Sequence, residues 1–128
     1  MQRGKLGGNV ALIEAVGADD HGDFLKQSIA RSRVDHTHVS TLEGVATGTA
    51  VITVDGHGEN TIIVSPGANG RLGQQHLDEA GAAFDGAALV CLCLCLEINT
   101  QTVLDAAGRA RAARARVLFN LPPHGGSR

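Results

Sequence analysis

The chain has 128 residues, of which 43% are apolar and 19% are charged, and its formal net charge is −2. These values fit one ordinary globular domain with a single core and exclude a wholly disordered chain. Neither half carries a basic block, and three phenylalanines are the only aromatic residues, so we expect no nucleic-acid partner.

The first predicted elements form an α/β unit. Residues 9–16, NVALIEAV, are short, apolar and rich in β-branched side chains, which predicts a buried strand. No apolar signal-peptide core precedes them, so we expect a cytoplasmic protein. After Gly17, either Asp19 or Asp20 can cap a helix through residues 21–32.

The next segment is predicted to be antiparallel. Residues 38–44 form a plausible strand, and residues 47–54 and 60–65 flank the glycine-containing turn 55–59, which predicts a hairpin. Both arms carry neighbouring apolar side chains and are therefore apolar on both faces, whereas a hairpin exposed on one side alternates apolar with polar residues. A ligand, a partner chain or the rest of the fold should cover the second face.

The remaining pattern alternates helices and strands. It predicts a loop over residues 66–73, a helix over 74–84 and a strand over 87–96. A second helix, capped by Asn99 or Thr100, follows over about 100–115, and a final strand over 116–123. The expected order is β-α, three antiparallel strands, then α-β-α-β. The apolar run 87–98 is too short to cross a bilayer as a helix, so we expect no membrane contact.

Cys91, Cys93 and Cys95 all lie in the apolar strand of residues 87–96. Alternate residues of a strand share one face about 6.6 Å apart with parallel side chains. That arrangement suits neither a disulfide nor a tetrahedral zinc site. We expect these cysteines to be small buried side chains without a chemical role.

Polar residues at the ends of the predicted strands are the candidate site. Glu97 follows an apolar strand directly before a helix, which is where ligands bind in open α/β sheets, and its carboxylate could orient sugar hydroxyls or could be an exposed loop residue. Asn120 occupies the matching position on the next strand, where it could bind a ligand or form an Asx turn. Thr47 and Gly48 open the hairpin, where they could meet a ligand or serve the turn alone.

Three other patterns carry weaker functional hypotheses. Residues 4–9, GKLGGN, precede the first strand and lack the spacing and the Ser/Thr of a phosphate loop, so we reject a nucleotide site there. His36 and His38 are close in sequence but have no clustered third ligand, so we expect no metal site. Arginines at the end of the second long helix favour a solvated face over a phosphate site: Arg109, Arg111, Arg114 and Arg116.

Four segments, taken in order, resemble ribokinase-like members of the PfkB carbohydrate kinase family. Residues 10–25 resemble the family's strand, glycine turn, acidic pair and helix. Residues 47–69, TGTAVITVDGHGENTIIVSPGAN, are similar to its lid hairpin and the Pro-Gly-Ala-Asn exit. Residues 94–98, LCLEI, stand where the family has Gln-Leu-Glu, and residues 119–123, FNLPP, resemble Asn-Pro-Ala-Pro. The resemblance covers nearly the whole chain.

The resemblance implies a partial ribokinase-like α/β fold: a Rossmann-like parallel sheet with helices plus a small antiparallel β lid. The partial domain would span residues 1–123, with the lid at about 38–66 and a tail at 124–128. It implies that Glu97 binds a hydroxyl of a pentose such as ribose beneath the lid. It also implies a homodimer through the lid hairpin, which would cover the second apolar face.

The departures from the family pattern concern catalysis. We expect the chain to begin after the family's first strand, with its sugar-binding Asp, and after the Gly-Gly-Lys-Gly-Ala-Asn loop. Neither the Asn-x-x-Glu motif nor the Gly-Ala-Gly-Asp motif of the nucleotide half follows Pro123, and Cys95 replaces the Gln of Gln-Leu-Glu. The full-length family uses ATP and Mg²⁺; we expect neither to bind here and assign no catalytic residue.

Three hypotheses follow from this comparison. The first is a truncated carbohydrate kinase, the sugar-binding half only, which is inactive alone because the catalytic base and the ATP site are missing. The second is a non-catalytic module that dimerises or binds sugar. The third is a gene remnant whose product folds poorly.

Overall fold

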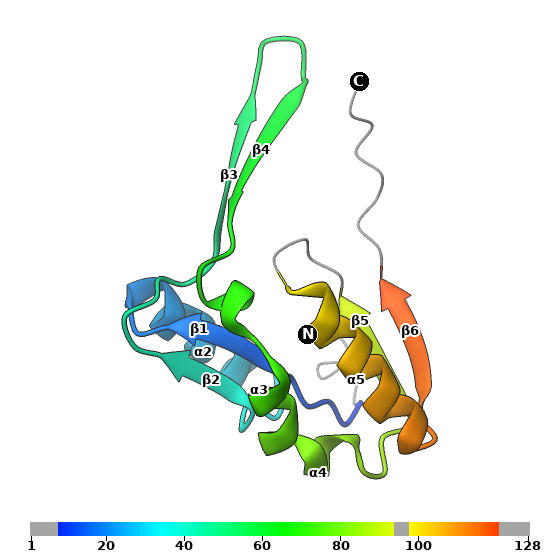
Figure 1. Cartoon of the computed structure of the whole chain (residues 1–128). Helices are drawn as coiled ribbons and strands as arrows, with labels where there is room; N and C mark the ends of the chain where they lie inside the picture. Colours follow the sequence, from blue (N-terminus) through cyan, green and yellow to red (C-terminus); the bar gives the residue numbers. More distant parts are fainter. Residues whose placement is uncertain (1–7, 94–97, 121–128) are drawn as a thin grey trace.

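The computed structural model describes residues 8–93 and 98–120, and three separate pairs of strands organise this part of the chain (Figure 1). The first pair is parallel and joins β1 (Glu14–Gly17) to β2 (Val39–Leu42). Helix α2 (Asp20–Arg31) connects the two strands. Asp19 caps this helix, since its side chain accepts a hydrogen bond from the Gly22 amide.

The pairing of β2 corrects one prediction. The sequence suggested that this strand belonged to an antiparallel group of three, but β2 runs parallel to β1, and Glu14 lies opposite Val39. The physical reason is the connection, because a helix between two strands returns the chain to the same end of the sheet and produces parallel pairing. Among the described residues, the antiparallel part is therefore the predicted hairpin alone.

That hairpin consists of β3 (Thr49–Val54) and β4 (Asn60–Ser65), which rise away from the body of the molecule (Figure 1). Its register places Val51 opposite Ile63, and Ile52 opposite Ile62 on the other face. At the tip, the Asp55 carboxylate accepts hydrogen bonds from the backbone amides at 57 and 59. The predicted hairpin and its two apolar faces are confirmed.

Short helices follow the hairpin. A 3-10 turn, η1 (Gly67–Arg71), replaces the predicted loop, and the predicted helix of residues 74–84 is broken into α3 (Gln74–Glu79) and α4 (Gly81–Phe84). Ala80 is both the C-cap of the first and the N-cap of the second. The break occurs beside a glycine, the residue that loses most conformational freedom in a helix.

The third pair is parallel and joins β5 (Leu89–Cys93) to β6 (Arg116–Asn120) through helix α5 (Thr100–Ala112). Asn99 caps this helix, because its side-chain oxygen accepts a hydrogen bond from the Gln101 amide at 2.8 Å. The predicted strand, helix and strand are thus confirmed within the described residues.

Two apolar clusters hold the body together. The first lies between α3, α4 and α5 and has four buried members: Leu77, Phe84, Ala106 and Ala110. The second lies between β1 and η1 and has three: Ala15, Ala68 and Leu72. Ile13 packs against both clusters and therefore links the two parallel strand pairs.

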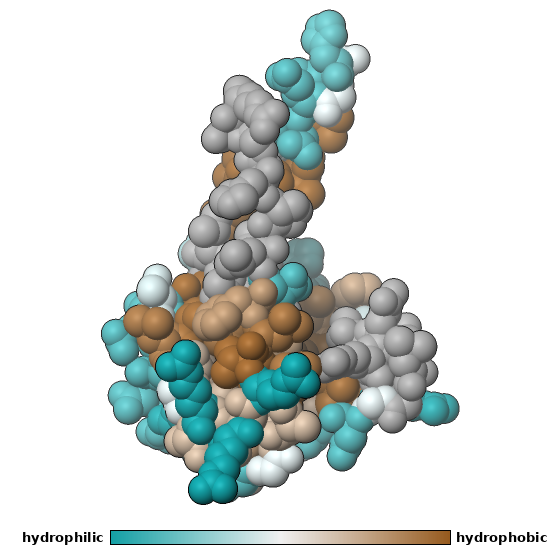
Figure 2. All heavy atoms as spheres, turned by 90° about the vertical axis from the view of Figure 1, so that its right-hand side faces the viewer, coloured by the Kyte–Doolittle hydropathy of each residue, from teal (hydrophilic) through white to brown (hydrophobic). Residues whose placement is uncertain are grey.

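Strand β6 is more exposed than its apolar sequence predicted. Leu118 and Phe119, on opposite faces of the strand, are 51% and 48% exposed, and Cys91 on β5 is also exposed. Figure 2 faces this side and shows apolar surface in the middle of the body. The expectation of fully buried strands is wrong for β6, and the expectation of a buried cysteine is wrong for Cys91, because no described element packs over these side chains. Cys95 lies outside the described residues. No helix among the described residues has the length and hydropathy to span a bilayer.

Candidate functional site at the base of the hairpin

The structure separates the four residues that the sequence nominated. Thr47 and Gly48 lie together where the chain enters the hairpin, two residues before β3 begins. Asn120 is exposed at the carboxyl end of β6, opposite Cys93 of β5. Glu97, the principal candidate, lies outside the described residues.

Thr47 is tied to the turn between β1 and α2. Its hydroxyl donates to one carboxylate oxygen of Asp19 at 2.5 Å, and its amide donates to the other oxygen at 2.8 Å. The same hydroxyl accepts a hydrogen bond from the Gly17 amide at 2.9 Å. Thr47 is only 5% exposed, so these bonds satisfy polar groups that water cannot reach.

The carboxylate of Asp19 therefore serves two elements at once. It accepts from the Gly22 amide at 2.8 Å, as a helix cap does, and from Thr47, which is 28 residues away in sequence. The Thr47 hydroxyl, the Thr47 amide and the Gly22 amide all favour the ionised form and lower the pKa of Asp19 to about 2. Asp19 thus stays negatively charged throughout the physiological range.

Backbone segments approach one another closely at this corner. A Cβ atom at Gly17 would lie 2.2 Å from the carbonyl oxygen of Val45, and one at Gly67 would lie 2.3 Å from that of Ala46. Gly67 also has a φ of 51°, which favours glycine. The Ala68 amide donates to the Ala46 carbonyl at 2.8 Å and closes the base of the hairpin.

Ile98 and the start of α5 reach the same corner. Ile98, the residue after Glu97, packs against the cluster of β1 and η1, as does Val45 just before the hairpin. The hydroxyl of Thr102 in α5 donates to the carbonyl of Leu72 at 2.8 Å. The start of α5 is therefore fastened to the elements around the hairpin base.

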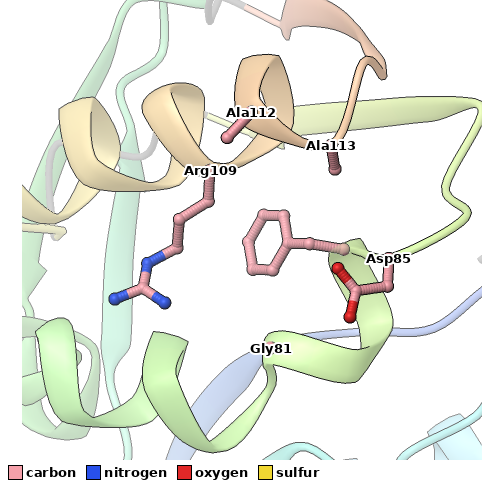
Figure 3. A pocket seen from close by; sticks show the side chains of 6 residues that line it. Gly81, Asp85, Arg109, Ala112 and Ala113 are labelled. Carbon is pink, nitrogen blue, oxygen red and sulfur yellow. The ribbon is translucent and has the colours of Figure 1, made fainter.

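A shallow pocket of about 280 Å³ lies elsewhere, between α4 and the end of α5 (Figure 3). Phe84 forms part of its lining, and the side chains of Asp85 and Arg109 flank it. Arg109 is engaged in an ion pair with Asp78, which fits the solvated role that its helix-end position predicted. The pocket is at the opposite end of the molecule from the hairpin (Figure 1).

Sequence analysis missed the second role of Asp19. An acidic residue after a glycine predicted a helix cap, and the structure confirms that cap at Asp19 rather than Asp20. Nothing local in the sequence connects Asp19 to Thr47, because the intervening helix and strand bring them together. The available signal was a hydroxyl residue directly before a glycine at the hairpin entrance.

Comparison with known proteins identifies a carbohydrate-kinase pattern along almost the entire chain. The family model described as pfkB family carbohydrate kinase matches residues 4–127. The chain is 33% identical over 119 residues to the ribokinase of Haemophilus influenzae. This alignment covers 93% of this chain and 38% of that enzyme.

Solved structures agree with the sequence match. A ribokinase from Giardia lamblia superimposes with a TM-score of 0.76 at 28% identity, covering 91% of this chain and 36% of that one. A fructokinase with bound ATP from Xylella fastidiosa gives 0.80 at 26% identity, covering 98% and 42%. The chain therefore spans about two-fifths of the length of these relatives.

Proposed function

Because the chain belongs to the pfkB family of carbohydrate kinases, we propose that it is the sugar-binding part of a ribokinase-like enzyme. The family reaction would be the ATP-dependent phosphorylation of a pentose such as ribose. The observation that carries the proposal is the apolar hairpin, exposed on both faces, beside the carboxyl ends of parallel strands. Such strand ends are the usual ligand site of open α/β sheets.

The proposed sugar contacts come from the hairpin entrance and from residues at the ends of the last two predicted strands. The Glu97 carboxylate would accept hydrogen bonds from sugar hydroxyls. The next residue in the sequence, Ile98, packs against the same apolar cluster as Val45. Gly48 would let a sugar approach the backbone. The Thr47 hydroxyl is buried and already bonded to Asp19 and Gly17, so Thr47 would hold the hairpin entrance beside the sugar. Asn120 would contribute its amide from the end of β6.

Phosphoryl transfer needs further groups. A base must orient the attacking hydroxyl, and N–H donors or cations must stabilise the charge of the transferred phosphoryl group. The resemblance assigns these roles to a Gly-Ala-Gly-Asp motif, which does not occur in the 128 residues. Among the described residues, no three His, Cys, Asp or Glu side chains gather around a point that could hold a metal ion. We therefore expect sugar binding without catalysis by this chain alone.

Calorimetry and an assay of ADP release test both parts of the proposal. We expect ribose to bind the unmodified chain, Glu97→Ala to abolish the binding heat, and Glu43→Ala, an exposed loop control, to retain it. Fructose belongs in the same series because both ribokinases and fructokinases are relatives. No heat with any sugar would remove the sugar-binding proposal. Ribose-dependent ADP release that Glu97→Ala abolishes would show that the chain is catalytic after all.

A second candidate function, a dimerising module without catalysis, is favoured by the hairpin itself. Every residue of β3 and β4 is exposed, including six Val and Ile side chains between 39% and 65% exposed. Apolar surface gathered in one place is typical of interaction sites. We propose that two hairpins pair in a homodimer, and sedimentation at low micromolar concentration tests this. A clean monomer would contradict it.

A cooperative thermal transition bears on the hypothesis of a poorly folding remnant. Ordinary mesophilic domains melt at about 45–65 °C. A single transition in this range would exclude the remnant hypothesis, while gradual loss of helical signal without a transition would support it.

A further inference from the structure

The direction in which the hairpin leaves the body depends on very few contacts. Strands β3 and β4 make extensive contacts only with each other within the described part of the chain, and all their residues are exposed. Packing along the arms therefore cannot hold the hairpin at one angle. Any fixed angle must come from its base.

At that base, Thr47 is held at three points. Its hydroxyl and its amide bind the two different oxygens of one carboxylate, and the hydroxyl also accepts from Gly17. Two bonds to separate oxygens of a planar group fix orientation as well as distance. Since β3 starts two residues later, the orientation of Thr47 sets the direction of the first strand.

The other strand is fixed to the same place. The bond between the Ala68 amide and the Ala46 carbonyl joins the exit of the hairpin to its entrance. Contacts at Gly17 and Gly67 leave no room for a Cβ atom, so the three backbone segments touch directly. Rotation of the hairpin would have to break the Asp19 bonds before these segments could separate.

We propose that Asp19 and Thr47 form a hairpin anchor that fixes the angle between the hairpin and the body. Asp19 is thus a positioning residue for the lid, beyond its role as a helix cap. The mechanical part stands on these contacts alone. Its importance for holding a sugar rests on the proposed function.

Residual dipolar couplings of the ¹⁵N-labelled chain test the anchor without any ligand. In the unmodified protein, we expect hairpin amides and α2 amides to fit one alignment. Thr47→Val removes the hydroxyl and with it the hydrogen bonds to Asp19 and Gly17. We expect the couplings of the hairpin amides to shrink by about half or more, while those of the α2 amides persist. Thr47→Ser retains the hydroxyl and should restore them.

A matched control lies on the hairpin itself. The Thr53 hydroxyl donates to the Thr61 carbonyl at 3.3 Å in an exposed position, so Thr53→Val should leave the couplings unchanged. If Thr47→Val does not fold, Asp19→Asn tests the same anchor. The substitution replaces one carboxylate oxygen by a side-chain nitrogen, which cannot accept the hydrogen bond from the Thr47 amide. All samples are compared as monomers, since pairing of hairpins would restrain them independently.

Unchanged hairpin couplings in Thr47→Val would overturn the anchor. If only Asp19→Asn folds, unchanged hairpin couplings in that variant would overturn it. A chain that binds no sugar but loses hairpin alignment on substitution would remove the proposed function and leave the anchor intact.

Discussion

The hairpin base and the hairpin arms are adjacent in sequence and opposite in their physical environment. Thr47 is 5% exposed and every polar atom of its side chain is bonded, whereas Val51 and Ile52, a few residues on, are 57% and 59% exposed. At the base, steric contacts and hydrogen bonds determine which residues are acceptable. Along the arms, no packing against the rest of the described chain restricts which residues are acceptable.

This difference separates two kinds of sequence requirement. Glycines and polar residues at the base are explained by this chain's own fold, because a larger or apolar side chain would clash or leave a partner unsatisfied. The Val and Ile side chains of the arms exceed what strand pairing needs. A sugar or a partner chain that covers these side chains would explain them. That need for a cover is the physical basis of both proposed functions.

The largest expected effect contrasts glycine substitutions in the two regions. In Gly17→Ala the new Cβ would lie 2.2 Å from a backbone oxygen, and we expect a loss of about 3 kcal/mol or more in the free energy of unfolding. Gly56→Ala at the hairpin tip meets nothing within 4 Å and should change it by less than about 0.5 kcal/mol. Urea unfolding followed by circular dichroism measures both.

Equal losses for the two variants would break the contrast between base and arms. A tolerated Gly17→Ala would mean that the segments carrying Gly17 and Val45 can separate at little cost. That result would also weaken the hairpin anchor, which depends on their contact.

The two faces of the arms can be separated by paired substitutions that follow the strand register. Val51→Thr with Ile63→Thr changes one face, and Ile52→Thr with Ile62→Thr changes the other. Threonine keeps the strand preference but removes apolar surface. Each substitution removes apolar surface worth about 0.7 kcal/mol when covered. Four such side chains meet in a homodimer, so the face that dimerises should lose roughly a hundredfold in affinity.

Sedimentation equilibrium measures that loss, and each double variant is the control for the other. We expect one pair to weaken association while the other leaves it unchanged. Unchanged association in both variants would exclude the arms as the dimer contact, whereas equal weakening would show that covering both faces requires the partner.

Sequence patterns predicted those parts of the fold that depend on local preferences. The glycine turn with apolar arms located the hairpin, and Asp19 and Asn99 marked the starts of helices that the structure confirms. Strand partners are a different matter. The segment now seen as β2 pairs with β1 across an intervening helix, and its own residues carry no information about which neighbour it will have.

Exposure and long-range bonds were equally out of reach. An apolar strand such as β6 predicts burial, but burial depends on what packs against it, and Leu118 remains half exposed. The Asp19–Thr47 bond joins residues that only the folded topology brings together. For the candidate site, sequence placed Thr47 and Gly48 at the hairpin entrance correctly, while the sugar-binding roles of Glu97 and Asn120 stay predictions.

The smallest expected effect concerns acid, and it tests the base without changing its shape. The pKa of Asp19 is about 2 in the folded protein against an ordinary value of 3.8, so the unfolded chain binds this proton more tightly. The carboxylate therefore stabilises the fold fully above about pH 4, and this stabilisation is lost as the pH falls through the folded value near 2.

Asp19→Asn cannot ionise and should lose less stability than the unmodified chain between pH 5 and pH 2, which urea midpoints at each pH measure. Asp20→Asn, at the exposed neighbouring position, leaves the Asp19 carboxylate in place and should keep the acid dependence that Asp19 confers. The lowered pKa of Asp35, which is caused mainly by the Thr37 hydroxyl, contributes equally to all three proteins and cancels in the comparison. Equal loss of stability with falling pH in Asp19→Asn and in the unmodified chain would contradict this. It would mean that Thr47 does not bond the Asp19 carboxylate in solution, because only a bonded carboxylate has a lowered pKa and therefore contributes to the acid dependence.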